Sequence, residues 1–256
     1  SLLARLDEAM GRERRFTGNV AHELRTPIAE LRSIAAVGTR WPGDEAAVEQ
    51  FFRDVDVVAG RMEGLVADLL LLARCQGGAE PAERRPVALR EAVETAWAGE
   101  STRARGREAP FTLDVPEDLR IEADPGKLAI VLRNLLSNAA VHGTPGCEVR
   151  CVARRRGGRV RLEISNEAEP LSAQDLSRLT DPFWRKDAAR ASDAHAGLGL
   201  AIAAALTSLL RIDLAFEQAP GGTFTVRLEG DAPAADSAPG GAPDPADRAT
   251  LPLSRS

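Results

Sequence analysis

A histidine within a polar segment is the first group in this chain that could carry chemistry. Residues 16–27 read Phe-Thr-Gly-Asn-Val-Ala-His-Glu-Leu-Arg-Thr-Pro, and they contain His22, Glu23, Thr26 and Pro27. A neutral imidazole is a nucleophile near pH 7 and can attack a phosphorus atom in line. Glu23 can accept the other ring proton, which orients the ring and raises its basicity. Pro27 removes a backbone donor, so the helix is expected to bend beside His22.

Two amides spaced four residues apart form a second candidate group. Asn134 and Asn138 stand in a leucine-rich segment that ends at His142. On a helix this spacing puts both amides on one side, with the histidine one turn further on. An amide oxygen is a hard ligand that suits Mg²⁺ bound to phosphates. The chain has no GxxxxGK[ST] motif, so it is not a P-loop protein.

Cationic and glycine-rich segments follow in the last third of the chain. Residues 182–190 contain Phe183 and Trp184 and three cations that can donate to phosphate oxygens, namely Arg185, Lys186 and Arg190. The next segment is Gly197, Leu198, Gly199 and Leu200, ahead of an apolar run. Glycines before a helix let backbone amides approach a phosphate at the positive helix end.

In this order, these segments resemble the H, N, F and G2 boxes of the sensor histidine kinases of two-component systems, over about residues 1–229. The resemblance implies that His22 is the phosphoacceptor and that Thr26 positions water for dephosphorylating a partner protein. It also implies that Asn138 binds the metal, that Asn134 lies on the phosphate side, and that residues 221–223, with Thr223, lie near the adenine. ATP and Mg²⁺ are the ligands that it implies.

The segment at residues 164–170 departs from the family pattern. The family has DxGxG, whose aspartate accepts a proton from the adenine amino group; here Asn166, Ala168 and Pro170 take those places. Asparagine keeps an acceptor oxygen but loses the charge, which costs on the order of 1–2 kcal/mol. We therefore expect a variant G1 box, with roughly tenfold weaker ATP binding and a stiffer loop.

The patterning predicts an α+β chain with two domains. Apolar residues recur at threes and fours over residues 1–40 and again to about residue 74, which predicts two long helices broken at residues 41–44. After residue 86 short strands alternate with helices, which predicts an α/β sandwich. The expected domains are a helical hairpin at 1–76, a linker at 77–85, an ATP-binding domain at 86–230 and a disordered tail at 231–256.

The two long helices cannot bury their apolar stripes against each other alone. A second copy would complete a four-helix bundle, so we expect a homodimer. The chain opens in a helical pattern at residues 1–6, and we expect further helix before Ser1. The resemblance places a sensor and any membrane segment there as well.

Composition excludes some partners and sites. The formal net charge of -5 provides no field for nucleic acid. Three cysteines without a CxxC spacing favour free thiols over a disulfide frame or zinc site. No apolar run is long enough to span a membrane. Five arginines at residues 154–161 surround Gly157-Gly158, which indicates first a solvated hairpin and second a phosphate-binding patch.

We therefore predict the cytoplasmic portion of a bacterial inner-membrane protein, in contact with the membrane only through upstream segments. It would transfer phosphate from ATP to His22 and then to an aspartate of a response regulator. The alternative is a degenerate kinase, acting as a phosphatase or scaffold, which residues 166–170 motivate. A third possibility is a related ATPase of the chaperone or mismatch-repair type, against which the helical hairpin argues.

Overall fold

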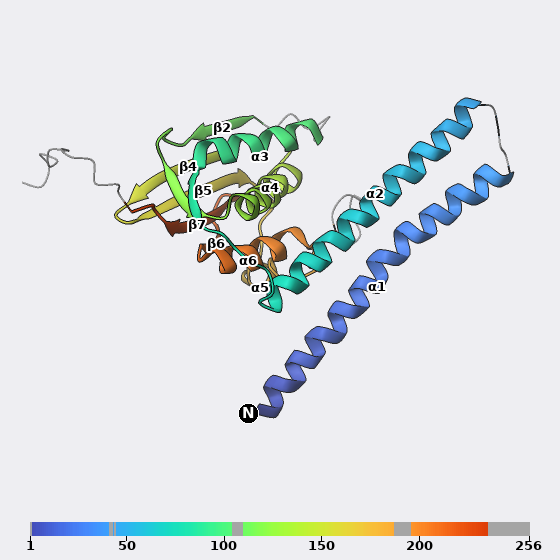
Figure 1. The fold of residues 1–256 in the computed structure, drawn as a ribbon, viewed down its shortest axis with the longest axis horizontal. Coiled ribbons are helices and arrows are strands. Elements are labelled where there is room, and N and C mark those ends of the chain that lie inside the picture. Colours follow the sequence, from blue (N-terminus) through green and yellow to red (C-terminus); the bar gives the residue numbers. More distant parts are fainter. Residues whose placement is uncertain (1, 41–42, 44, 104–109, 187–195, 235–256) are drawn as a thin grey trace, which may run out of the picture.

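The computed structural model describes residues 2–40, 43, 45–103, 110–186 and 196–234. Two antiparallel helices form a long arm, α1 at Leu2–Arg40 and α2 at Glu45–Gln76, and a mixed α/β domain lies against the lower part of α2 (Figure 1). The expected α+β fold, a helical hairpin followed by an α/β sandwich, is confirmed. The tail expected at 231–256 lies outside the described residues from residue 235 onward.

In its described residues, the α/β domain has two sheets and four helices. Its strands are β1 Arg85–Ala88, β2 Phe111–Asp114, β3 Arg120–Ala123, β4 Val149–Arg156, β5 Arg159–Glu167, β6 Asp213–Gln218 and β7 Thr223–Asp231. Its helices are α3 Leu89–Arg103, α4 Pro125–His142, α5 Ala173–Arg178 and α6 Gly199–Leu210.

The strands form one large sheet and one small one. The five-stranded sheet has the order β2-β4-β5-β7-β6, in which only the β2–β4 pair is parallel. Strands β1 and β3 pair separately and antiparallel. At the ends of the domain, Arg85 pairs with Ala123 in β1–β3 and Asp231 pairs with Arg159 in β5–β7. Strand β1 and helix α5 were not predicted, since both are short.

The core fills the space between one face of the large sheet and the helices. Alternate residues of β5, Val160, Leu162 and Ile164, are buried, as the period of a strand requires. They pack in one cluster with Leu132 and Leu136 of α4. Because this cluster holds α4 against the sheet, the polar residues of α4 have a fixed position.

The other face of the large sheet carries matched charges. Arg161 lies 2.8 Å from Glu229 on the neighbouring strand β7, and Arg159 lies 2.7 Å from Asp213 on β6, one strand further across the sheet. Arg154 pairs with Asp114 on β2. Three of the five arginines at residues 154–161 are therefore opposed by carboxylates, as a solvated hairpin, the first interpretation, would have them.

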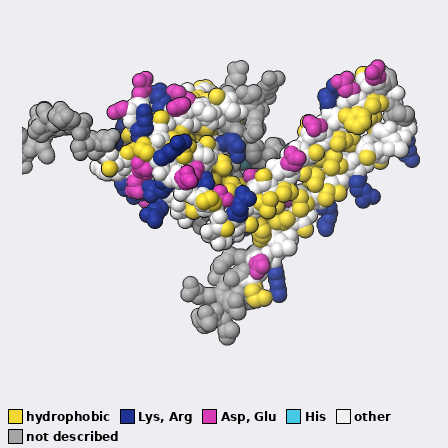
Figure 2. Space-filling model, viewed as in Figure 1, with side chains coloured by type: hydrophobic (Ala, Val, Ile, Leu, Met, Phe, Trp, Pro, Cys, Tyr) yellow, Lys and Arg dark blue, Asp and Glu magenta, His cyan; other side chains and the backbone are white. Residues whose placement is uncertain are grey.

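The hairpin leaves much apolar surface uncovered. Figure 2 shows an apolar band along the two helices, and Phe52, Val57 and Leu70 of α2 are 71%, 59% and 55% exposed. Isolated exposed apolar residues need no explanation, but a continuous band of them does.

Candidate functional site

The segment that contains His22 lies within α1, which continues through Pro27 without interruption. The side chains of His22 and Thr26 are exposed and lie one turn apart. No described residue hydrogen-bonds to His22, so its ring is accessible to a nucleotide. Glu23 is half-buried and adjacent in sequence, and neighbouring residues on a helix point in different directions. The proposed contact between Glu23 and the ring is therefore absent among the described side chains.

The α/β domain packs against the part of α2 that lies opposite His22 of α1. Arg61 of α2 pairs with Glu30 of α1 at 2.9 Å, and Phe51 of α2 lies beside Gly38 of α1. The residue numbers of two facing residues in this antiparallel hairpin therefore sum to about 90. The same antiparallel register puts His22 opposite residues 68–69 of α2. Leu69 and Leu72 of α2 pack against the core of the α/β domain, and Leu72 is only 2% exposed.

A second contact joins the domains through α1. The ring of Phe16 lies 5.6 Å from the ring of Phe183, centroid to centroid. Phe16 precedes His22 by six residues, or about 9 Å along the helix. The residues from 182 to 186, called the F-box segment here, are thus in direct contact with the helix that carries His22.

Helix α4 presents the two asparagines that the sequence singled out. Asp124 caps this helix by accepting from the backbone nitrogen of Lys127 at 3.0 Å, and Pro125 opens it. Asn134 and Asn138 are half-buried and one turn apart, while their leucine neighbours are buried. His142 is exposed at the end of the helix, one turn further on. The polar residues therefore follow one side of α4.

Asn134 meets the start of α6 directly. A Cβ placed on Gly199 would lie 3.0 Å from Oδ1 of Asn134, so glycine is needed for this approach. Leu198 is buried, Leu200 is half-buried, and α6 begins without a side-chain cap. The first backbone N–H groups of α6 thus have no capping side chain, as an anion site at a helix N-terminus requires.

Asn166 is 6% exposed at the end of β5. Its Nδ2 donates to the carbonyl of Glu167 at 3.1 Å, and the same carbonyl accepts from the Thr144 nitrogen at 2.7 Å. Gly143, the residue after α4, allows this packing, because a Cβ there would lie 2.6 Å from the Ala139 carbonyl and 3.1 Å from Asn166 Nδ2. Asn166 is thereby fixed beside the C-terminal end of α4.

The loop after β5 is tied to the turn before β7. The Ala168 nitrogen donates to the Gly222 carbonyl at 3.0 Å, and Gln218 accepts from the Leu171 nitrogen at 2.6 Å. Gln218 also donates to the Glu169 carbonyl at 3.1 Å. Thr223 is exposed and pairs with Glu167 in the sheet register. The sequence reasoning missed Gln218, since nothing in its local pattern indicates a link to a loop about fifty residues earlier.

The F-box segment is held by its backbone. Phe183 has a positive φ of 67° and donates its N–H to the Gly197 carbonyl at 2.9 Å. Gly197 has a φ of +71°, and a Cβ there would lie 3.0 Å from the backbone of Phe183. The structure therefore explains Gly197 by close packing against Phe183 as well as by its conformation.

The cations of this region do not all point toward the asparagines. Lys186 donates to the Pro170 carbonyl at 2.8 Å and lies 3.6 Å from the Glu169 carboxylate. Arg185 is half-buried. Arg190 lies outside the described residues. Lys186 therefore contacts the loop after β5 in this structure.

The linker between the domains is anchored by charges. Glu80 lies 2.9 Å from Arg74 of α2 and 3.2 Å from Lys127 of α4. The hydrogen bond from Lys127, followed by that from Arg74, holds the pKa of Glu80 below its usual range. Burial acts to raise the pKa of Asp124, but backbone hydrogen bonds from Lys127 and Glu83 outweigh it and lower that pKa. Both carboxylates are therefore charged at neutral pH.

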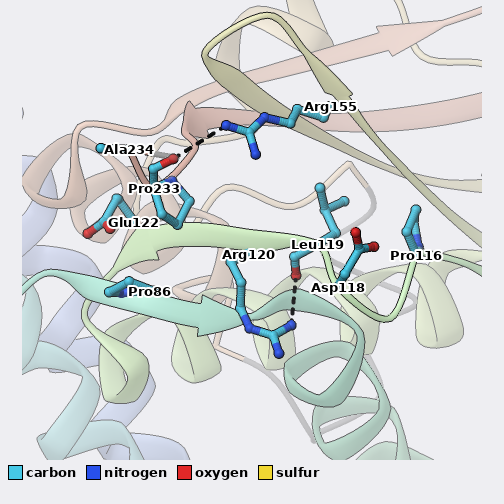
Figure 3. Close-up of a pocket in the computed structure, with 9 residues that line it drawn as sticks. All are labelled: Pro86, Pro116, Asp118, Leu119, Arg120, Glu122, Arg155, Pro233 and Ala234. Carbon is cyan, nitrogen blue, oxygen red and sulfur yellow. Dashed lines mark hydrogen bonds between the residues drawn. The ribbon is translucent and has the colours of Figure 1, made fainter. Parts of the chain in front are cut away.

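A cavity of about 640 Å³ lies away from these residues, beside β1 and β3 (Figure 3). Its lining includes Pro86, Arg120 and Arg155, and it contains none of the predicted site residues. Within the described part of the chain there is no cluster of three acidic, histidine or cysteine side chains that could hold a metal by itself. Among the described helices, none is long and apolar enough to cross a membrane.

Comparison with known proteins supplies the family context. Residues 12–78 match the model of the His Kinase A (phospho-acceptor) domain, and residues 123–232 match that of the Histidine kinase-, DNA gyrase B-, and HSP90-like ATPase. The chain is 30% identical over 200 residues to the sensor-like histidine kinase SenX3 of Mycobacterium tuberculosis, covering 78% of this chain and 48% of that protein. It is 35% identical over 214 residues to the sensor protein CseC of Streptomyces avermitilis, covering 82% and 39%.

The fold is also found among solved structures. The histidine kinase AdeS of Acinetobacter baumannii matches with a TM-score of 0.66 at 20% identity, over 83% of this chain and 98% of that one. The chain spans about half the length of the curated relatives it matches, such as SenX3.

Proposed function

We propose that this chain, which belongs to the sensor histidine kinases with HisKA and HATPase_c domains, transfers the γ-phosphate of ATP to His22 and then to an aspartate of a response regulator. The observation that carries this proposal is the docking of the ATPase domain at the height of His22. Leu69 and Leu72 of α2 support that docking from one side, and the Phe16–Phe183 contact supports it from the other.

The transfer requires a ring nitrogen of His22 that is free to attack. In the step, a nitrogen–phosphorus bond forms on His22 while the bond between the γ-phosphorus and its bridging oxygen breaks, and ADP leaves. The proton on the other ring nitrogen passes to Glu23 or to water. Glu23 would have to change its side-chain rotamer, with a local bend beside Pro27, to reach the ring. The protein contributes mainly positioning and charge neutralisation, as phosphoryl transfer requires.

The nucleotide would lie along the polar side of α4, with its base beside Asn166 and Thr223. Its phosphates would lie near Asn134, His142 and the uncapped N-terminus of α6 at Gly197–Leu200, with Phe183 holding the neighbouring segment in place. Arg185 and Arg190 would donate to phosphate oxygens, and Lys186 would do so after leaving Glu169 and Pro170.

The amide oxygen of Asn138 would bind Mg²⁺. The site fits this ion, because Asn138 lies on the same side of α4 as Asn134, and Asn134 contacts the N-terminus of α6. When bound, Mg²⁺ supplies neutralisation of the phosphate charge. Asn134 would orient the phosphates beside it.

The apolar band on the hairpin supports a homodimer with a four-helix bundle. The exposed face of α1 around His22 and Thr26 would receive the response regulator, and Thr26 would position water for its dephosphorylation. We place the chain in the cytoplasm of a bacterium, next to an inner membrane that it reaches through preceding segments.

Radiolabelled ATP tests the proposal. Wild-type protein with Mg²⁺ should acquire an acid-labile label, and His22→Gln should acquire none while still binding ATP. Label that persists in His22→Gln would refute the assignment of the phosphoacceptor.

Asn166, Ala168 and Pro170 depart from the family's DxGxG pattern, and this departure favours a second candidate function. The chain would then act as a phosphatase or scaffold without efficient autophosphorylation. A wild-type protein that acquires no label but binds the regulator and dephosphorylates it would favour this second function.

A further inference from the structure

The orientation of the Asn166 amide is determined by its neighbour. A backbone carbonyl can only accept hydrogen bonds, so the side-chain atom 3.1 Å from the Glu167 oxygen must be the NH₂ group. The Thr144 N–H donates to the same carbonyl and holds it in place. The amide cannot flip without placing two oxygens against each other. Oδ1 of Asn166 is therefore directed away from Glu167.

This oxygen has no protein partner among the described residues. Asn166 is 94% buried. Among the described residues, the side-chain nitrogen and oxygen atoms that are fully enclosed and have no hydrogen-bond partner are the Nε atoms of three arginines, and Oδ1 of Asn166 is not one of them. The oxygen consequently reaches the surface beside the end of α4. An amide NH₂ also carries two hydrogens, and only one of them is used by Glu167. The side chain thus offers one acceptor and one spare donor.

We propose, on the basis of the function proposed above, that Asn166 reads the adenine base with both atoms. Oδ1 would accept from the 6-amino group, and the spare Nδ2 hydrogen would donate to the adjacent ring nitrogen, N1 or N7. Asparagine pairs with adenine in this bidentate way in nucleic-acid recognition. An aspartate at this position can only accept, so the asparagine adds a direct contact that the family residue lacks.

The fixed orientation also gives selectivity. Guanine carries an oxygen at position 6, which would face Oδ1 and repel it. To bind guanine the amide must flip, and the Glu167 carbonyl opposes the flip. Asn166 and Glu167 together therefore select adenine over guanine.

The test measures dissociation constants of wild type and Asn166→Asp by calorimetry, with Mg²⁺ present. The nucleotides are ATP, GTP, 1-deaza-ATP, 7-deaza-ATP and purine riboside triphosphate, which lacks the 6-amino group. For wild type we expect binding to weaken roughly tenfold to a hundredfold for GTP, for purine riboside triphosphate and for one of the two deaza analogues. The deaza analogue affected identifies the ring nitrogen. In Asn166→Asp the loss with purine riboside triphosphate should remain, and the loss with the deaza analogue should disappear.

Wild-type protein that binds ATP and both deaza analogues equally would overturn the inference and leave the proposed function intact. Protein that binds no adenine nucleotide would refute both. Because the measurements of all five nucleotides on wild-type protein test the inference by themselves, the outcome does not depend on whether Asn166→Asp folds.

Discussion

The aromatic rings of Phe16 and Phe183 meet at 5.6 Å and 52°, although 167 positions separate the two residues in the chain. One belongs to the helix of His22 and the other to the segment that precedes the predicted phosphate contacts. A movement of α1 therefore bears directly on the ATPase domain. Such a tilted pair contributes about 0.5–1.5 kcal/mol beyond its buried area.

Phe16→Ala should loosen the docking of the ATPase domain without changing its nucleotide site. The docked population is expected to fall roughly two- to tenfold, as the energy of one aromatic pair implies. Small-angle scattering should show a larger radius of gyration, and the dissociation constant for ATP should stay within about twofold. Thr17→Ala, an exposed neighbour on α1, is the control. An unchanged radius in Phe16→Ala would mean that the contact contributes nothing to docking.

Gly199→Ala should weaken ATP binding while leaving the fold stable. The added methyl group would lie 3.0 Å from Asn134 Oδ1 and displace that amide, while alanine favours the helix that starts there. We expect roughly tenfold weaker binding of ATP, the size of one displaced polar contact, and an unchanged or higher melting temperature. Gly126→Ala, whose Cβ meets only an ordinary contact at 3.5 Å, serves as the control. Equal affinities of the two variants for ATP would show that Asn134 does not contribute to nucleotide binding.

Thr26→Ala should separate the two proposed activities. Thr26 is exposed one turn from His22 and makes no hydrogen bond with a described residue, so its loss should not disturb α1. Autophosphorylation should stay within about threefold, and dephosphorylation of the regulator should fall about tenfold or more, since the side chain would no longer position water. Both rates can be followed with labelled phosphate. Unchanged dephosphorylation would remove Thr26 from the mechanism.

Acid should release the linker from the ATPase domain. The pKa of Glu80 is lowered in the folded protein, so its contribution to stability is present above the usual glutamate value of about 4.3 and is lost as the pH falls through the lower folded value. Urea unfolding should show Glu80→Gln to be less stable than wild type at pH 7. The difference should shrink steadily between pH 5 and pH 3.

The matched variant for this experiment is Glu83→Gln, because Glu83 contributes its backbone nitrogen and not its carboxylate to the contact with Asp124. Its stability relative to wild type should not vary with pH in the same range. A constant difference between Glu80→Gln and wild type from pH 7 to pH 3 would contradict the role given to Glu80.

The local elements were predictable because short-range rules produce them. Asp124 and Pro125 are a cap and a first-turn proline that open α4, and Gly157-Gly158 turns β4 into β5. Strand β1 was missed, since its four residues pair with β3 across an intervening helix and no local alternation reveals the partner.

The sequence by itself determined the chemistry available: a nucleophilic histidine on a helix, two amides one turn apart, and an asparagine where the resembling family has aspartate. Spacing along one helix is sufficient to place His22 with Thr26, and Asn134 with Asn138. Only the tertiary structure decided which distant groups meet. It placed Asn134 against Gly199 and fixed the orientation of the Asn166 amide through the Glu167 carbonyl. It also directed Lys186 to the Pro170 carbonyl, in the loop after β5, rather than to α4. These contacts depend on how the core packs α4 and α6 against the sheet, and the range of a local sequence pattern does not extend that far.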